Sequence, residues 1–353
     1  MGREICVTPD KTILPAGEWA DMDADGRRAF RMLASGKRFK YDIDGSKAAY
    51  SYTSSDGGWS WQRGGALMPY RAPIQGLRNA GVQMQSPRHA GRIVLPFYLQ
   101  LDGQHPDYTR QDRGGYAIYR GEKILLETHT HVPEMAGAFM VYSDDEGASW
   151  QTSDGFLVGY FDDGRMGFFT CDEPAVVELS DGRLLCYMRS TCGRILESES
   201  RDGGRAWSKV AATDLAMSNS PCALARIPGS LDLVLVWNQV SSKEIEHGFR
   251  RGRLSMAISR DDGQSWECFK TLELVSGLSE ARRIAPPPLA SMIRGPSGPD
   301  QVLGEVPDDM RHFGYPEIYF HGDQVSICYK QHEPGRPHPM KWKTFSLDWL
   351  YAL

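Results

Sequence analysis

The feature that most constrains this chain is an eight-residue pattern, Ser-x-Asp-x-Gly-x-x-Trp, which occurs four times. The copies begin at Ser54, Ser143, Ser200 and Ser259. Ser and Asp side chains can accept hydrogen bonds from backbone N–H groups of a tight loop, Gly allows a positive φ, and Trp can fold back as an apolar plug. A short apolar or alternating stretch precedes each copy, which is typical of a strand that runs into a turn. We therefore interpret the copies as structural turns, and not as a carboxylate site made of four Asp residues.

The spacing of the copies predicts the architecture. The last three begin 57 and 59 residues apart, and six units of that size fit a chain of 353 residues. The first interval, 89 residues, is longer, and the extra length falls in the polar segment 104–121, which we expect to be a long loop. Units of four short antiparallel strands repeated radially form a β-propeller, which leaves only short protected edges. The sequence thus predicts an all-β, six-bladed β-propeller as one domain over 1–353, with 1–45 as an N-terminal segment.

Two units can be divided into strands in some detail. The first has predicted strands over 175–179, 184–189 and 195–199, and the next over 223–227, 231–237 and 254–258. A last unit, with strands predicted over 317–320, 325–329 and 341–347, lacks the turn pattern. If the strands of a blade are lettered A to D, the A–B and C–D turns lie on one face and the B–C and D–A connections on the other. We expect functional side chains on the second face.

Composition excludes several classes of function. The chain has 40 Lys and Arg against 45 Asp and Glu, a net charge of −5, which argues against binding to nucleic acid. Its apolar runs are shorter than the roughly 20 residues of a bilayer helix, and it opens with no secretory signal, so we expect no membrane partner. A cytoplasmic location is expected for the chain as given, or a secreted or periplasmic one if a signal was removed. The seven Cys form no CxxC pair, and His129 and His131 are interpreted as structural, so no metal or other cofactor is predicted.

The four turns, together with the segment 172–183 that leads to Met188-Arg189-Ser190, resemble the sialidase (neuraminidase) superfamily, whose turns are called Asp boxes or BNR repeats. The resemblance spans about 54–347. It implies a glycoside hydrolase of carbohydrate metabolism, an exo-α-sialidase that removes terminal sialic acid or a related nonulosonic acid with retention. Such sites combine three Arg residues for the substrate carboxylate, a Tyr nucleophile activated by Glu, and an Asp acid/base. Arg suits the carboxylate because its planar fork binds both oxygens.

Matching this pattern to the chain selects four residues for the centre of the site. Glu173 opens strand A of one blade, Arg189 closes strand B, and Tyr315 opens strand A of the last blade. Arg251 stands three residues before a strand C, with Arg250 and Arg253 as competitors. Tyr315 is the implied nucleophile, Glu173 its base, and Arg189 and Arg251 carboxylate ligands. All four fall in D–A or B–C connections, which the strand order predicts independently.

The acid/base and the third Arg have more than one candidate. Asp44 stands ten positions before Ser54 and is the first candidate for the acid/base, with Asp42 next. Arg71, in a Tyr-Arg-x-Pro stretch, and Arg28, or its neighbour Arg27, are candidates for the third Arg. Arg88 opens a basic segment, 88–92, that we place in a D–A connection where it could contact a glycan, or simply face solvent.

Two other functions stay open at this stage. The chain could be a propeller glycosidase or lyase for another acidic sugar, or a glycan-binding propeller without activity. A binding module needs no Tyr–Glu pair, so the separation of Tyr315 and Glu173 discriminates between these classes. In each case the expected partner is a sialylated or other acidic glycan, and the sequence indicates neither its linkage nor the oligomeric state of the protein.

Overall fold

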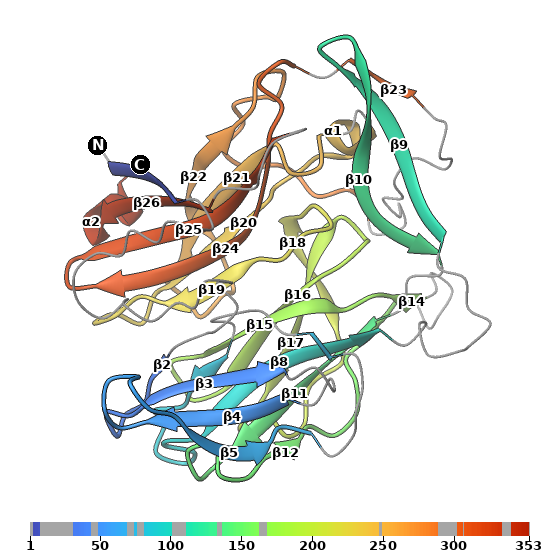
Figure 1. Ribbon diagram of the computed structural model, residues 1–353. Helices are drawn as coiled ribbons and strands as arrows, with labels where there is room; N and C mark the ends of the chain where they lie inside the picture. Colours follow the sequence, from blue (N-terminus) through green and yellow to red (C-terminus); the bar gives the residue numbers. More distant parts are fainter. Residues whose placement is uncertain are drawn as a thin grey trace.

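Five of the sheets among the described residues follow one another along the chain, each built as a blade (Figure 1). The computed structural model describes residues 3–7, 31–43, 49–68, 74–75, 81–100, 111–132, 136–161, 168–246, 249–288, 302–305, 307–333 and 340–352. Consecutive strands of a blade pair antiparallel, and the chain is an all-β propeller.

Blades 1 and 2 come from the N-terminal part of the chain. Blade 1 consists of β2 (Arg31–Met32), β3 (Arg38–Ile43), β4 (Ala49–Ser54) and β5 (Gln62–Ala66). Blade 2 consists of β6 (Ile74–Gln75), β7 (Val82–Gln83), β8 (Ile93–Gln100), β11 (Ala136–Ser143) and β12 (Gln151–Thr152). Both β6 and β7 pair with β8, so together they supply strand A of blade 2 in two pieces.

Blades 3 and 4 match the strands predicted from the sequence closely. Blade 3 consists of β15 (Asp172–Glu178), β16 (Leu184–Arg189), β17 (Arg194–Ser200) and β18 (Ala211–Ala216). Blade 4 consists of β19 (Ala223–Arg226), β20 (Leu233–Trp237), β21 (Arg253–Ser259) and β22 (Glu267–Leu274). A short hairpin, β13 (Gly159–Tyr160) with β14 (Phe168–Phe169), precedes blade 3, and α1 (Ser242–Glu246) lies in the B–C connection of blade 4.

Blade 5 joins the two ends of the chain. It consists of β24 (His312–His321), β25 (Gln324–His332) and β26 (Met340–Ser346), with β1 (Arg3–Val7) paired to β26 as the fourth strand. The helix α2 (Leu347–Tyr351) follows β26. Figure 1 accordingly shows both termini beside this blade. Among the described residues, no helix has the length and apolar character needed to cross a membrane.

The described residues form five blades, so the prediction of six is wrong. Dividing the chain into equal units treated long connections as if they were blade strands. Segment 104–121 was expected to be a loop, but its second half lies in β9 (Gln111–Tyr119), which pairs with β10 (Glu122–Val132) inside the B–C connection of blade 2. β23 (Val302–Glu305), from the connection between blades 4 and 5, pairs with β9 in parallel. These three strands form a separate sheet beside the blades (Figure 1).

Hydrophobic packing between consecutive blades holds the fold together. Four apolar clusters join blades 1 and 2, 2 and 3, 3 and 4, and 4 and 5. β20 shows why the sequence folds in this way. Successive side chains of a strand point to opposite faces, so Leu233, Leu235 and Trp237 pack toward blade 3, whereas Val234 and Val236 pack toward blade 5. A strand buried on both faces therefore appears in the sequence as an unbroken apolar run.

The four Ser-x-Asp-x-Gly-x-x-Trp segments form the C–D connections of blades 1 to 4, and we call them the repeat turns. In each turn the Ser hydroxyl oxygen accepts a hydrogen bond of 2.8–2.9 Å from the backbone N–H of the Gly four residues later. The Asp carboxylate accepts another, also 2.8–2.9 Å, from the backbone N–H four residues beyond it. All four Gly residues have φ between 86° and 98°, a conformation that favours glycine.

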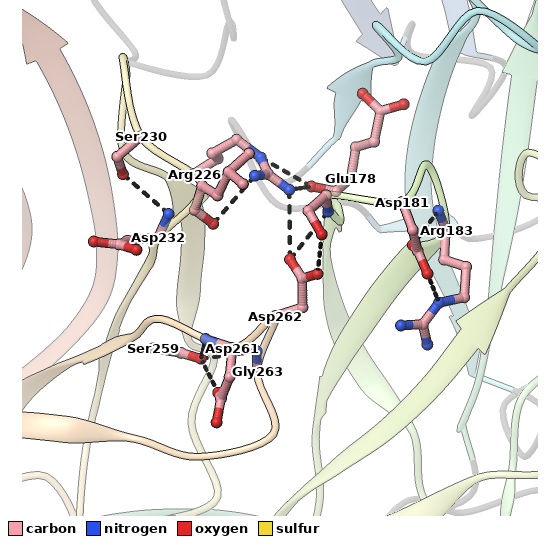
Figure 2. Close-up of polar contacts among 12 residues, drawn as sticks. Glu178, Asp181, Arg183, Arg226, Ser230, Asp232, Ser259, Asp261, Asp262 and Gly263 are labelled. Carbon is pink, nitrogen blue, oxygen red and sulfur yellow. Dashed lines mark hydrogen bonds and ion pairs between the residues drawn. The ribbon is translucent and has the colours of Figure 1, made fainter.

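Polar contacts also tie the repeat turns to the preceding blade. Figure 2 shows the junction between blades 3 and 4, where the Asp262 carboxylate of one repeat turn accepts a 3.0 Å hydrogen bond from the Ser180 N–H in the A–B turn of blade 3. Arg226 donates to the Glu178 backbone oxygen and lies 3.8 Å from Asp262. At the junction of blades 1 and 2, Lys37 pairs with Glu146 at 2.7 Å. The A–B and C–D turns of neighbouring blades therefore interlock on one face of the propeller.

Candidate active site

Glu173 and Tyr315 occupy matching places at the start of strand A in blades 3 and 5. In both strands a β-bulge interrupts the pairing, between Asp172 and Ala175 in β15 and between Gly314 and Glu317 in β24. Both residues have positive φ, 36° for Glu173 and 54° for Tyr315, and both directly precede a proline. Proline disfavours helical conformations in the residue before it, and a positive φ is strained for any side-chain-bearing residue. Bulges and strain of this kind re-aim side chains and are concentrated at functional sites.

The two re-aimed side chains meet across the blades. The Tyr315 phenol lies close enough to the Glu173 carboxylate for that carboxylate to raise its pKa. Arg189, at the end of β16, donates from Nη1 to Glu173 Oε2 at 2.5 Å and from Nε to Asn219 Oδ1 at 2.6 Å. Glu173 and Arg189 are only 5% and 4% exposed, so this is a buried ion pair. A buried carboxylate with both a cation and a phenol in contact is held in one orientation.

Arg251 completes a polar circuit through blades 3, 4 and 5. Its Nη2 donates to the backbone oxygen of Asn219 at 2.9 Å, and its own backbone oxygen accepts from Phe313 N–H at 2.9 Å. The Arg251 guanidinium carbon lies 5.7 Å from the centre of the Tyr315 ring. A Cβ at Gly314 would lie 3.4 Å from Arg251 Nη1, so the missing side chain at this position leaves room for the guanidinium.

The charges of the site act directly on the phenol. Burial and then the negative charge of Glu173 raise the pKa of Tyr315, while Arg189 and Arg251 lower it, and the net direction is upward. Tyr315 is therefore a neutral phenol at ordinary pH, with a carboxylate as acceptor for its proton. Burial opposes the charge of Arg189, but the neighbouring carboxylates of Glu173 and Asp172 raise its pKa, so the guanidinium stays charged.

The structure brings together the four residues predicted for the centre of the site: Glu173, Arg189, Arg251 and Tyr315. Their common location at D–A and B–C connections, opposite the repeat turns, agrees with the prediction from strand order. Arg253, a competitor of Arg251, is 1% exposed and pairs with Glu244 at 2.7 Å, which gives it a structural role. Arg250 is also buried.

The N-terminal candidates are placed differently. Asp44, Arg27, Arg28 and Arg71 lie outside the described residues, and Asp42 lies in β3. The prediction that Arg88 lies in a D–A connection is wrong, because the turn 84–92 connects β7 to β8 within blade 2 and is therefore an A–B turn.

Contacts of the same turn show which face Arg88 occupies. The neighbouring Arg92 pairs with Asp144 at 2.7 Å and donates to the backbone oxygens of Asp202 and Gly203. These three partners belong to repeat turns of blades 2 and 3. Arg88 is therefore an exposed side chain on the repeat-turn face, away from Glu173 and Tyr315.

Three residues near the site escaped the sequence analysis. Asn219 contacts both Arg189 and Arg251. Lys330 Nζ lies 4.8 Å from the centre of the Tyr315 ring. Tyr98, on β8 of blade 2, is buried. This burial is the main cause that raises its pKa, and the charges of Asp172 and Glu173 raise it further. One signal could have found Asn219: it precedes Ser220-Pro221 at the start of blade 4, as Asp172 precedes Glu173-Pro174 and Gly314 precedes Tyr315-Pro316.

Comparison with known proteins assigns the chain to a family. A family model described as "BNR repeat-like domain" matches residues 30–327. The chain belongs to the BNR repeat-like domain family. The resemblance to the sialidase and BNR-repeat superfamily that the four turns predicted is thereby confirmed. Within the described part of this BNR repeat-like chain, no group of three His, Cys, Asp or Glu side chains could hold a metal ion.

Solved structures are similar to this chain at low sequence identity. A protein of unknown function from Dyadobacter fermentans DSM 18053 is 15% identical, with a TM-score of 0.55 over 90% of this chain and 75% of that one. The leech intramolecular trans-sialidase, in complex with 2,7-anhydro-Neu5Ac, is 15% identical, with a TM-score of 0.48 over 93% of this chain and 43% of its own. The Trypanosoma rangeli sialidase in complex with the inhibitor DANA is 12% identical, with a TM-score of 0.40 over 90% of this chain and 55% of its own. This chain thus spans about half the length of either sialidase. No curated protein matches it.

Proposed function

We propose that this protein is an exo-α-sialidase that removes terminal sialic acid, or a related nonulosonic acid, from glycoconjugates with retention at the anomeric carbon. The observation that carries the proposal is the Tyr315 phenol beside the buried Glu173 carboxylate, which Arg189 holds at 2.5 Å. A non-catalytic binding propeller has no need of a phenol paired with a buried carboxylate at two strained positions. The pair therefore supports an enzyme over a binding module.

A neutral nucleophile suits a substrate that carries a carboxylate on its reacting carbon. An anionic nucleophile would be repelled by that carboxylate, whereas a phenol approaches uncharged and loses its proton only as the new bond forms. In the proposed first step, the Tyr315 oxygen bonds to the anomeric carbon, its proton passes to Glu173, and the bond to the glycosidic oxygen breaks. The leaving oxygen takes a proton from an acid, for which Asp44 is the sequence candidate.

The second step releases the sugar and restores the enzyme. Water, deprotonated by the same acid/base, attacks the anomeric carbon, the bond to Tyr315 breaks, and the phenol recovers its proton from Glu173. Two inversions give net retention. The raised pKa of Tyr315 makes the phenolate a poor resting state, so proton transfer to Glu173 must accompany the attack.

Arg189 and Arg251 differ in burial, and we assign them different roles. Arg189 is 4% exposed and holds Glu173 through Nη1, so its first task is to orient the base. Arg251 is less buried and lies against the Tyr315 ring, where the carboxylate of a bound sugar would be adjacent to the nucleophile. A contact between Arg189 and the substrate stays a prediction, as do the roles of Asp44, Arg28 and Arg71.

Turnover of a fluorogenic α-sialoside, measured across about pH 4 to 8, tests the proposal. Tyr315→Phe removes the nucleophilic oxygen and should lower kcat by about a thousandfold or more, as loss of a covalent nucleophile generally does. Tyr329→Phe is the matched control, because Tyr329 donates its hydroxyl proton to a carboxylate, that of Glu273, but between β25 of blade 5 and β22 of blade 4. A folded wild-type protein without turnover, or a Tyr315→Phe variant as active as Tyr329→Phe, would contradict the proposal.

A further inference from the structure

A third cation, Lys330 of β25, accompanies Arg251 at the Tyr315 ring. Its Nζ lies 4.8 Å from the ring centre, closer than the 5.7 Å of the Arg251 guanidinium carbon. The two cations reach the ring from different blades, since Arg251 belongs to the B–C connection of blade 4. A phenol between two cations is a place where negative charge is favoured.

The register of blade 5 explains why a cation at position 330 reaches the nucleophile. Lys330 pairs with Gly314 across β24 and β25, at the last pairing before the bulge that contains Tyr315. In blade 3 the corresponding pairing, Asp172 with Arg189, places a cation beside the bulge that contains Glu173. The same local geometry thus supplies a strand-B cation to each member of the Tyr–Glu pair.

The two strand-B cations differ in what they can contact. Arg189 is buried and donates to Glu173 and Asn219. Lys330 is exposed, and Tyr315 and Arg251 are half-buried, so a ligand from solvent can reach this side of the phenol. The flexible stem of a lysine lets its ammonium move from the ring to an anion that arrives beside it.

We propose that Lys330 is a specificity-determining residue that, together with Arg251, binds the carboxylate of the sugar beside Tyr315. Lys330 would then take the place of the third arginine that the family resemblance implies. This inference rests on the proposed function, because it assumes an anionic sugar bound at Tyr315. It adds that recognition of the anion depends on blade 5 itself, the blade that carries the nucleophile.

A ligand pair that differs only in charge tests the proposal. The affinity of 2-deoxy-2,3-didehydro-N-acetylneuraminic acid and of its methyl ester is measured by titration calorimetry on the full chain. Lys330→Met should weaken binding of the acid about tenfold and of the ester less than about twofold, and Lys330→Arg should restore most of the loss. A merely structural role would weaken both ligands alike.

Lys209→Met is the matched control, because Lys209 is also exposed and lies 5.7 Å from the centre of a tyrosine ring, that of Tyr160. Its affinity for both ligands should equal that of the wild type. If the wild type hydrolyses the sialoside and Lys330→Met binds the acid as Lys209→Met does, the inference about Lys330 is overturned and the proposed function stands. If the wild type neither hydrolyses the sialoside nor binds the acid, both are overturned together.

Discussion

The two faces of the propeller are built in opposite ways. On the repeat-turn face, the hydrogen bonds within a repeat turn join residues two to four apart, as between Ser259 and Asp261 or Gly263, so eight consecutive residues contain most of the structure. On the site face, Glu173, Arg189, Arg251 and Tyr315 come from three blades and meet only after those blades have packed. The first face can form from local sequence, whereas the second depends on the assembled fold.

Positive φ shows the same contrast. In the repeat turns the residue after Asp has φ between 56° and 78°, and it is Gly57, Glu146, Gly203 or Asp262. Glycine serves there in two turns of four, so the conformation matters more than the side chain. On the site face, positive φ falls on Glu173 and Tyr315, where glycine would remove the group that the proposed reaction needs. On the site face, the strained backbone conformation therefore falls on residues whose side chains the proposed reaction uses.

The contacts of the two faces also differ in exposure. Arg183 on the repeat-turn face pairs with Asp181 and Glu199 at 2.7 and 2.5 Å, and both carboxylates are at least one-third exposed. The Arg189–Glu173 pair has the same 2.5 Å distance but is almost fully buried. Loss of one partner should therefore cost more stability in the buried pair than in the exposed pair. A buried charge without its partner is not solvated, whereas an exposed one is.

The largest expected effect follows from breaking the buried pair. Arg189→Met leaves Glu173 buried without its cation, and we expect the free energy of unfolding to fall by about 3 kcal/mol, with loss of turnover. Arg183→Met, in the same blade, should cost less than about 1 kcal/mol and leave turnover unchanged. Urea unfolding followed by tryptophan fluorescence measures both.

A double variant shows whether the cost arises from the stranded carboxylate. Arg189→Met combined with Glu173→Gln removes the buried charge and should recover part of the stability lost in Arg189→Met, although turnover stays lost. Equal destabilisation by Arg189→Met and Arg183→Met would contradict the contrast between the faces.

A smaller effect is expected from a repeat turn. Ser259 is fully buried, and Ser259→Ala removes the acceptor of the Gly263 N–H, which should lower the free energy of unfolding by about 1–2 kcal/mol. Turnover by the folded variant should equal that of the wild type. Ser265→Ala removes only an exposed hydroxyl that donates to Asp261 in the same turn, so it should have little effect on stability. Altered kcat in Ser259→Ala at temperatures where it is folded would show that the two faces are coupled.

Sequence reasoning succeeded where the information is local and failed where it depends on assembly. Strand β16 over Leu184–Arg189 was predicted to the residue, because its turn and apolar run lie within the segment itself. The blade count was wrong because a period measured on blades 2 to 4 says nothing about insertions such as the β9–β10 hairpin. Arg88 was misplaced because strand A of blade 2 is split into β6 and β7, which leaves two residues in each piece and no recognisable strand pattern.

The residues of the candidate site also differ in whether the sequence could reveal them. Glu173 and Tyr315 could be found because each opens strand A of a blade, where the family pattern places the base and the nucleophile. Lys330 could not, since its proximity to Tyr315 comes from the pairing of β24 with β25 across a bulge. A basic residue at the end of a strand has no sequence mark that separates it from an ordinary surface lysine.

The smallest expected effect concerns acid and the exposed carboxylate Asp56 of the first repeat turn. Hydrogen bonds from the Ser60 side chain, the Ser60 backbone N–H and Ser54 hold the pKa of Asp56 well below its ordinary value of 3.8. A lowered pKa in the folded state contributes stability that is complete above the ordinary carboxyl pKa and is lost as the pH falls through the folded value. The difference in melting temperature between the wild type and Asp56→Asn should therefore be constant from about pH 7 to 5 and shrink steadily below about pH 4. Ser60→Ala removes the largest of the three causes, so it should move the pKa of Asp56 upward and shift this loss to higher pH. A difference in melting temperature that stays constant down to about pH 2 would mean that the stability of the first repeat turn does not depend on the charge of Asp56.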